Sequence, residues 1–411
     1  MAEYEAYKDS GIPWLGEIPA HWSIERGKNI LTLLDRPVKD DDEVITCFRD
    51  GEVTLRKNRR EDGFTVSLQE IGYQGIEPGD LVVHGMDGFA GAIGVSDSRG
   101  KATPVLNVMD SPHNKRYLMY YLRMAAYKDV FLSLSTGIRV RSCDLRWNKL
   151  AVFPFLLPEC SEQDVIVSYI DRELAKANVL IAEAKTSIEE YKSWKASIIY
   201  EAVTKGLDPN VEMKESGIEW AGEIPVHWVL SRIKNETENM DSLREPISAE
   251  NRENKLGLYD YYGASGAIDK IDDYNVDDTV LLIGEDGANL RMRNLPLVYR
   301  ASGKFWVNNH AHILKVLDRN NYGYMAYLLE AGDYNVYITG AAQPKLSQFN
   351  LMRFPIPIAP RCEQDAIEAH LDRRVAEIDG LIDDKMALVE DLEAYRKSLI
   401  FEVVTGKRKV V

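Results

Sequence analysis

Glycine-rich runs can cradle phosphates, and this sequence has one in its first quarter, at Gly88, Gly91 and Gly94. The run lacks the G-x-G start of a dinucleotide-binding loop, and its surroundings do not predict that it opens a helix. The sequence also has no Walker A lysine, so ATP use is not expected. No S-adenosylmethionine site is recognisable either. These absences argue against cofactor-dependent catalysis.

Histidines and carboxylates form two further patterns that could do chemistry. One polar run could suggest metal binding: Asn308, Asn309, His310 and His312. We expect it to alternate along a single strand, with neither a carboxylate nor a third histidine nearby to complete a metal site. Asp87 and Asp286 could imitate paired catalytic acids, but they fall in equivalent loops of two sequence repeats. With no nuclease carboxylate cluster and no nucleophile–base set, we predict a non-enzyme without bound metal or cofactor.

The remaining chemistry-bearing residues lie in polar loops between expected strands, at 84–91, 135–146, 285–293 and 340–348. Arginine and lysine suit guanine edges in DNA, asparagine and glutamine suit adenine, and acids suit cytosine. Polar loops are more often plain surface, but these occur at matching positions in two repeats. With a basic cluster at 56–60, they supply the candidate DNA contacts: Arg56, Lys57, Arg59, His84, Asp87, Arg139, Arg141, Arg146, Glu285, Asp286, Asn289, Arg291, Arg293, Gln343 and Lys345.

Two blocks of sequence occur twice in the same order, which indicates an internal duplication. Residues 8–22, KDSGIPWLGEIPAHW, recur at 214–228 as KESGIEWAGEIPVHW, an offset of 206 residues. Residues 153–164, FPFLLPECSEQD, recur at 354–365 as FPIPIAPRCEQD, an offset of 201 that continues into SIIYEAVT and SLIFEVVT. The segments between the blocks agree poorly. A repeated scaffold with variable inserts is expected when two modules do one kind of job on two different targets.

The two variable segments, 23–152 and 229–353, are expected to be mixed α/β or strand-rich domains. In the first, strands and then a helix are predicted at 80–86, 91–97, 102–109 and 115–131. In the second, strands and then a helix are predicted at 278–287, 304–316 and 322–332. The helix therefore has the same relative place in both copies.

A long helix is predicted after each repeated FP block. Apolar residues alternate four and three apart, as in the a/d seam of a coiled coil, at Ile170, Leu174, Ala177, Ile181, Ala184, Ile188 and Tyr191. The second copy continues the pattern at Leu371, Val375, Ile378, Ile382, Lys385, Val389 and Leu392, where only the lysine breaks it. The first helix is expected to start at Ser161 or Glu162 and to stop at Lys205-Gly206.

About 40 residues at ~1.5 Å per residue give a helix of roughly 60 Å. The alternative to pairing is an ordinary helical hairpin packed on its own domain. Two matched seams favour antiparallel pairing of the two helices, which would then act as a spacer between the variable domains. Acidic residues on the outer faces are expected to be solvated rather than to dock a partner.

The SGIxWxGEIPxHW block does not have the residues of a catalytic site. Its tryptophans, proline and glycines suit a rigid, tightly packed lead-in, with Pro19 and Pro225 setting the entry into the next element. His21 and His227 each stand alone, so we expect packed structural histidines rather than ligands. A structural or subunit-docking role is therefore predicted.

Composition and charge limit the class of protein. The length of 411 residues suggests two or three domains, and no stretch approaches the ~20 apolar residues that span a bilayer. Residues 1–10 lack the layout of a signal peptide, and the four scattered cysteines indicate free thiols. We therefore expect a cytoplasmic protein without membrane contact. The net charge of −15 argues against a protein that simply coats DNA, although basic residues cluster locally.

These features together resemble the DNA-specificity subunit of type I restriction–modification enzymes, which serve in phage defence. The resemblance covers essentially the whole chain. It rests on the repeated blocks, on the closing SII/SLI-E-x-VT motif, and on the insert segments YYGASGAID at 261–269, LIGEDGAN at 282–289 and FWVNNHAHIL at 305–314.

The resemblance implies a mixed α/β fold with a pseudo-twofold internal repeat and an antiparallel coiled coil. It places lead-ins and target-recognition domains at 1–155 and 207–355, and the conserved long helices at 156–206 and 356–411. One departure concerns the loops after Thr136-Gly137 and Thr339-Gly340, which differ from each other as different half-sites would require.

The same resemblance implies a non-catalytic subunit that reads a bipartite, asymmetric site in double-stranded DNA from the major groove. Its helices would set the spacer between half-sites and bind two methyltransferase subunits. Two motor-nuclease subunits would join for restriction. S-adenosylmethionine, ATP and Mg²⁺ are then expected on those partners rather than on this chain.

Two other functions stay open at the level of sequence. A coiled-coil scaffold could join two protein partners without touching DNA, because strand-rich domains with basic loops fit that function too. A self-sufficient restriction or modification enzyme is the other alternative, and the missing cofactor and catalytic motifs argue against it.

Overall fold

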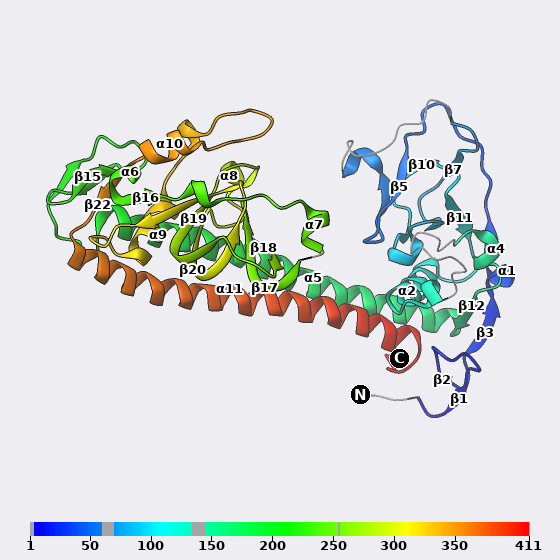
Figure 1. Ribbon diagram of the computed structural model, residues 1–411. Coiled ribbons are helices and arrows are strands. Elements are labelled where there is room, and N and C mark those ends of the chain that lie inside the picture. The colour runs from blue at the N-terminus through cyan, green and yellow to red at the C-terminus, as the bar shows by residue number, and fades with distance from the viewer. Residues whose placement is uncertain (1–3, 60–69, 134–144, 254, 411) are drawn as a thin grey trace. The chain divides into compact units, whose positions relative to one another are not determined.

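The computed structural model describes residues 4–59, 70–133, 145–253 and 255–410. The chain divides into two compact units (Figure 1). Unit 1 comprises Met1–Lys185 and Ala387–Val411, and unit 2 comprises Thr186–Met386. Two long helices, α5 (Cys160–Lys205) and α11 (Arg361–Val404), contribute residues to both units.

The lead-in of unit 1 is a short antiparallel strand pair, β1 (Tyr7–Asp9) with β2 (Glu17–Pro19). Ile18 and Trp22 are fully buried in a core that also contains Val403 and Val404 of α11. In unit 2 the second copy, β13 (Met213–Glu215) with β14 (Glu223–Pro225), packs in the same way against the end of α5. The repeated block therefore folds as a tightly packed lead-in, as its composition predicts.

Each variable segment begins and ends on adjacent strands. In unit 1, β3 (Ser23–Arg26) pairs antiparallel with β12 (Pro154–Leu157). In unit 2, β15 (Val229–Arg232) pairs in the same way with β22 (Pro355–Ile358). An insert whose two ends lie side by side can differ in sequence without disturbing the repeated scaffold.

The variable segment of unit 1 is built on a four-stranded antiparallel sheet in the order β4 (Thr32–Leu33), β11 (Leu106–Asp110), β8 (Leu81–His84) and β9 (Ile93–Val95). Alternate residues of β8 face different cores, as strand geometry requires. Leu81 and Val83 pack with helix α2 (Lys115–Tyr127), whereas Val82 packs in a second core. Two strand pairs contribute to that second core: β5 (Ile45–Cys47) with β6 (Val53–Leu55), and β7 (Gln74–Ile76) with β10 (Gly100–Ala102).

The variable segment of unit 2 carries a larger sheet with the same two-core arrangement. Leu281 and Ile283 of its central strand pack on the side of helix α9 (Tyr322–Ala331), and Val280 and Leu282 pack on the other side. The strand order is β16 (Thr237–Asn239), β21 (Ala311–Val316), β19 (Val276–Gly284), β20 (Val298–Val307), β17 (Leu256–Gly263) and β18 (Gly266–Ile271).

Three of the predicted elements are wrong in extent. The strand expected over 304–316 is two strands, because β20 ends at Val307 and the chain turns before β21. The helix expected over 115–131 ends at Tyr127, because Asp129 has a φ of 54°, outside the helical region. The strand expected over 102–109 is interrupted by a turn after Ala102.

The two long helices pack against each other in opposite chain directions within each unit. In unit 1, Ile166 near the start of α5 shares a core with Leu399 near the end of α11. In unit 2, Ile188 packs with Ile378 and Ile382. Lys385, the polar residue of the predicted seam, is half-buried. The acidic residues beside the seam are exposed: Glu183, Glu189, Glu190, Asp383, Asp384, Glu390, Asp391 and Glu393.

Candidate nucleic-acid interface

The repeated EQD motif, at 162–164 and 363–365, attaches each variable domain to the start of a long helix. Gln163 is buried, accepts the backbone N–H of Asn114 at 3.0 Å and donates to the Pro158 carbonyl at 2.9 Å. In the second copy, Gln364 accepts the N–H of Asn321 at 2.7 Å. The two asparagines cap helices α2 and α9 through their side-chain oxygens. The motif therefore fixes the first turn of each domain helix.

The lone histidines of the lead-ins make the same contact in both copies. His21 Nε2 lies 3.0 Å from Glu162 Oε2, and His227 Nε2 lies 2.6 Å from Glu363 Oε1. Their side chains are 52% and 41% exposed. The expectation of packed histidines is therefore wrong in detail, because these residues attach the lead-ins through hydrogen bonds at the surface.

Unit 1 has a polar groove beside the end of β8. Its volume is about 760 Å³, and its charged and titratable lining consists of Arg49, Asp50, Arg56, Arg59, His84, Asp87 and Cys47. The Arg49 guanidinium lies 3.0 Å from the Asp87 carboxylate, and the Arg59 guanidinium lies 4.2 Å from the centre of the Phe48 ring. The structure thus brings together four predicted residues (Arg56, Arg59, His84 and Asp87).

His84 presents a single donor in this groove. Its Nδ1 accepts the backbone N–H groups of Asp87 at 2.9 Å and of Met86 at 3.2 Å. Burial lowers the pKa of His84, although the nearby Asp87 carboxylate opposes the shift and Arg49 adds to it. The neutral ring therefore carries its proton on Nε2.

Two other predicted residues of unit 1, Lys57 and Arg146, are not among the residues that line the groove. Lys57 forms an ion pair with Glu43. Arg146 precedes the short helix α4 (Trp147–Leu150). Arg139 and Arg141 are outside the residues that the structure describes.

In unit 2 the two predicted polar loops lie against each other. Thr339 and Lys345 exchange backbone hydrogen bonds of 2.9 and 2.8 Å, which close the loop between them. Gly340 in this loop has a φ of 84°, in the left-handed region that glycine adopts freely. The Gly287 N–H donates to the Pro344 carbonyl at 3.0 Å, which joins this loop to the one after β19.

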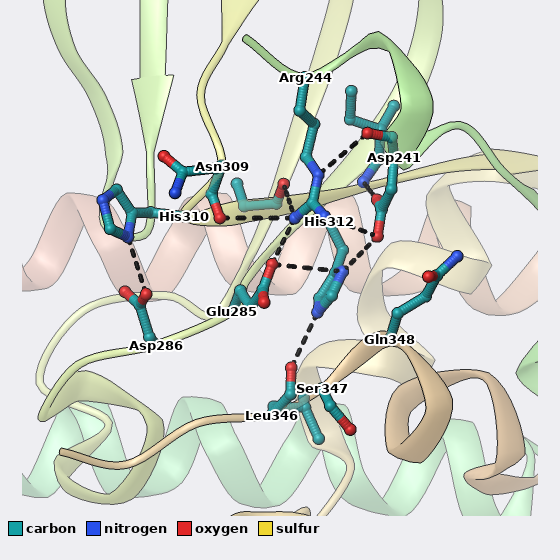
Figure 2. Close-up of polar contacts among 12 residues, drawn as sticks. Asp241, Arg244, Glu285, Asp286, Asn309, His310, His312, Leu346, Ser347 and Gln348 are labelled. Carbon is teal, nitrogen blue, oxygen red and sulfur yellow. Dashed lines mark hydrogen bonds and ion pairs between the residues drawn. The ribbon is translucent and has the colours of Figure 1, made fainter. Parts of the chain in front are cut away.

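A network of buried charges supports these loops (Figure 2). His312 is fully buried, with Nδ1 2.7 Å from Asp241 Oδ2 and Nε2 2.8 Å from the Leu346 carbonyl. Arg244 forms an ion pair with Glu285, whose other oxygen lies 3.0 Å from Lys345 Nζ.

The same view shows His310 and Asp286 joined at the surface, 2.7 Å apart. The expectation of no nearby carboxylate is wrong, because Asp286 contacts His310 and Asp241 contacts His312. The expected alternation along one strand is also wrong. His310 belongs to the turn between β20 and β21, and His312 belongs to β21.

The network keeps two carboxylates ionised. Burial acts to raise the pKa of Asp241, but hydrogen bonds from His312 and the Ile313 N–H, together with nearby positive charge, bring that pKa below its ordinary value. Burial likewise acts to raise the pKa of Glu285, but Arg244 and Lys345 lower it overall. Breaking one member of such a network leaves a buried charge without its partner, which is strongly destabilising.

The remaining predicted residues of unit 2 differ in their freedom to contact a ligand. The Asn289 carboxamide closes its own loop through Leu295 and Pro296. Arg293 binds the carbonyl of Glu330. Arg291 and Gln343 are exposed, and neither side chain has a hydrogen-bonding or ionic partner among the described residues.

Sequence reasoning missed Arg49, Asp241 and Arg244 as members of these clusters. Arg49 lies 38 residues before Asp87, and Asp241 lies 71 residues before His312. No local spacing marks contacts over such separations, although Arg49 stands near the basic cluster at 56–60. For His312 the sequence suggests only a possible metal ligand.

The part of the chain that the structure describes offers neither a metal-binding cluster nor a membrane-spanning helix. No group of three or more His, Cys, Asp or Glu side chains there could hold a metal ion. No helix there is long and apolar enough to cross a membrane.

Two packed lead-ins, two domain attachments and two different loop clusters define a protein with a duplicated scaffold and two dissimilar polar sites. Residues 228–386 match the model of the type I restriction modification DNA specificity domain. The chain is 29% identical to a type I restriction enzyme specificity subunit of Haemophilus influenzae over 164 residues, 40% of this chain and 39% of that relative. It is 22% identical to the MjaX specificity subunit of Methanocaldococcus jannaschii, over 96% of each chain.

Solved structures support the fold across almost the whole chain. One comes from a study of complex assembly in a type I R-M system, with a TM-score of 0.68 and 12% identity over 94% of this chain and 98% of that one. Another is the HsdS subunit of Thermoanaerobacter tengcongensis, with a TM-score of 0.50 and 13% identity over 95% and 98%. Together with the sequence matches, these findings confirm the resemblance to HsdS-type specificity subunits. The relatives are named specificity subunits, which agrees with the prediction that this chain is not an enzyme.

Proposed function

We propose that this chain is the DNA sequence-recognition subunit of a type I restriction–modification complex and performs no chemistry itself. In this proposal it reads a bipartite, asymmetric site in double-stranded DNA, with one half-site for each unit. One observation carries the proposal. The attachments built on Gln163 and Gln364 match, whereas the polar loop clusters that they position differ.

The two clusters offer different groups to base edges. Unit 1 presents an arginine-lined groove with His84 and Asp87. Unit 2 presents exposed Arg291 and Gln343 on the two loops that the buried charge network contacts through Glu285 and Lys345. In the major groove, arginine recognises guanine and glutamine recognises adenine through hydrogen bonds to the base edges. Different half-sites follow from these different residues, and the match of the specificity-domain model to residues 228–386 supports this role for unit 2.

The long helices would act as the spacer in this proposal. The 46 residues of α5 give a helix of about 69 Å, which corresponds to roughly 20 base pairs at ~3.4 Å each. The opposed packing of α5 and α11 in each unit supports an antiparallel coiled coil with pseudo-twofold symmetry. The predicted boundaries, with helical regions at 156–206 and 356–411, are part of this proposal.

The partners proposed are two methyltransferase subunits and, for restriction, two motor-nuclease subunits. They would carry S-adenosylmethionine, ATP and Mg²⁺, and the assembly would act in the cytoplasm. The net charge of −15 supports sharing of the phosphate contacts, because a chain so acidic has little overall attraction to DNA.

The test is co-purification with a methyltransferase partner, followed by DNA retention at increasing salt. We expect a stable complex whose retention falls with salt and weakens when Arg49→Ala removes a groove charge. Lys185→Ala, on the exposed face of α5, is the matched control and should bind as the wild type does. Loss of both co-purification and DNA retention in the wild type would favour a protein scaffold. Methylation or cleavage by the chain alone would favour an enzyme.

A further inference from the structure

Both units hold the end of their second polar loop through the same two hydrogen bonds. In unit 1, the Leu145 N–H donates to the Gly85 carbonyl at 2.8 Å, and Asn107 Nδ2 donates to the Leu145 carbonyl at 3.0 Å. In unit 2, the Leu346 N–H donates to the Glu285 carbonyl at 2.8 Å, and His312 Nε2 lies 2.8 Å from the Leu346 carbonyl. We call each arrangement a loop pin.

The two pins occupy equivalent places in their sheets. Asn107 and His312 are each the second residue of a strand, β11 and β21. Gly85 and Glu285 each follow directly after the neighbouring strand, β8 or β19. Backbone geometry is thus repeated in a region where the two copies share little sequence.

The side chains that make the pins are chemically different. Asn107 is a buried neutral amide that donates to the Val83 and Leu145 carbonyls. Both ring nitrogens of His312 face acceptors, the Asp241 carboxylate and the Leu346 carbonyl. Only the imidazolium form can donate to both. Asp241, Glu285, Arg244 and Lys345 are the charged groups around it.

We propose that Asn107 and His312 are positioning residues for DNA reading. Each holds the end of its second polar loop, Leu145 or Leu346, against the loop after β8 or β19. It thereby fixes the position of the adjacent candidate for base reading, Arg146 in unit 1 and Lys345 in unit 2, in its own half-site. The proposal rests on the function proposed above. It gives Asn107 and His312 the same positioning role, each in a different half-site.

The first test uses the full chain in complex with its methyltransferase partner, and duplexes in which one half-site or the other is altered. His312→Ala should lower discrimination at the second half-site about tenfold, the loss typical of one misread base pair, and leave the first unchanged. Asn107→Ala should do the reverse. His312→Asn introduces the amide of unit 1 and should recover most of the loss.

A control separates positioning from general destabilisation. Val280→Ala opens a cavity in the second core of unit 2, away from the pin. It should lower the denaturation midpoint while half-site discrimination is retained. Equal loss of discrimination in Val280→Ala and His312→Ala, or loss at both half-sites in His312→Ala, would overturn the proposal.

Hydrogen exchange on the full chain tests the pin without DNA. His312→Ala should speed exchange of the Lys345 and Leu346 amides and leave the β19 amides protected. Unchanged exchange at these two amides would show that His312 does not hold the end of the second polar loop. A wild-type complex with no sequence preference in DNA refutes the proposed function instead, and with it the role of the pins in reading.

Discussion

Asp241 and Glu285 are the residues at which negative charge is buried beside the polar loops of unit 2. Their side chains are only 6% and 10% exposed, yet both stay ionised because His312, Arg244 and Lys345 face them. A lowered pKa in the folded state means that the folded chain binds protons less readily than the unfolded chain does. Charge pairing at these residues therefore makes stability depend on pH.

The stability that these two carboxylates add is fully present above their ordinary pKa values of 3.8 and 4.5. It is lost as the pH falls through their lower folded-state values. We expect the free energy of unfolding to fall steeply below about pH 4, and Asp241→Asn to flatten that dependence. Urea denaturation across the acid range measures the slope. Glu238→Gln, an exposed control, should leave the slope unchanged, and equal slopes for wild type and Asp241→Asn would contradict this account.

Gln364 is the residue whose removal should loosen unit 2 from the start of α11. Gln364→Leu leaves the buried Asn321 N–H without an acceptor, which should cost about 1–3 kcal/mol. The urea midpoint measures this loss. Gln343→Leu makes the same change at an exposed position and should be neutral for stability. If the two variants are equally stable, the attachment does not depend on this carboxamide.

At the scale of elements, the long helices are the part of the fold that periodicity predicts best. Seam positions such as Ala177 and Ile181 are buried, and α5 spans Cys160–Lys205 against an expected start at Ser161 or Glu162. The prediction is strong because the spacing of apolar residues stays helical over many consecutive turns.

The turn between β20 and β21 escaped prediction for the opposite reason. Residues on both sides of it have strand composition, and the polar–apolar alternation resumes at His310, so the three consecutive polar residues 308–310 are the only local sign of the turn. The site was predictable only in part. The sequence indicates which loops carry polar side chains, but Arg49 and Arg244 reach those loops through tertiary contacts that no local pattern encodes.

The long helices are also the elements on which the spacer can be tested. Seven extra residues after Ala184 and seven after Lys385 preserve the a/d pattern and lengthen each helix by about 10 Å. We expect the spacer of the recognised site to grow by roughly three base pairs, at ~3.4 Å each. Sequencing of the modified sites gives the spacer directly. Four residues inserted after Ala184 alone shift the seam and should impair assembly. An unchanged spacer in the variant with seven extra residues in each helix would refute the proposal that the long helices set the spacer length.

At the scale of the whole molecule, the chain separates what is repeated from what varies. Lead-ins, helix attachments and long helices recur with matched contacts, such as Trp14 stacked on Phe153 at 6.0 Å and Trp220 on Phe354 at 5.6 Å. The variable segments enter and leave on the paired strands β3–β12 and β15–β22. In the proposed function, this arrangement would let one specificity change while the scaffold and the other specificity are kept.

The central claim is that one chain reads two half-sites independently, and exchange of residues 229–353 for the equivalent segment of another specificity subunit tests it most directly. Methylation-sensitive sequencing of a genome modified by the chimaera and its methyltransferase partner gives both half-sites in one measurement. The account predicts one new half-site, with the other half-site and the spacer unchanged. A change in both half-sites, or in neither, would contradict it.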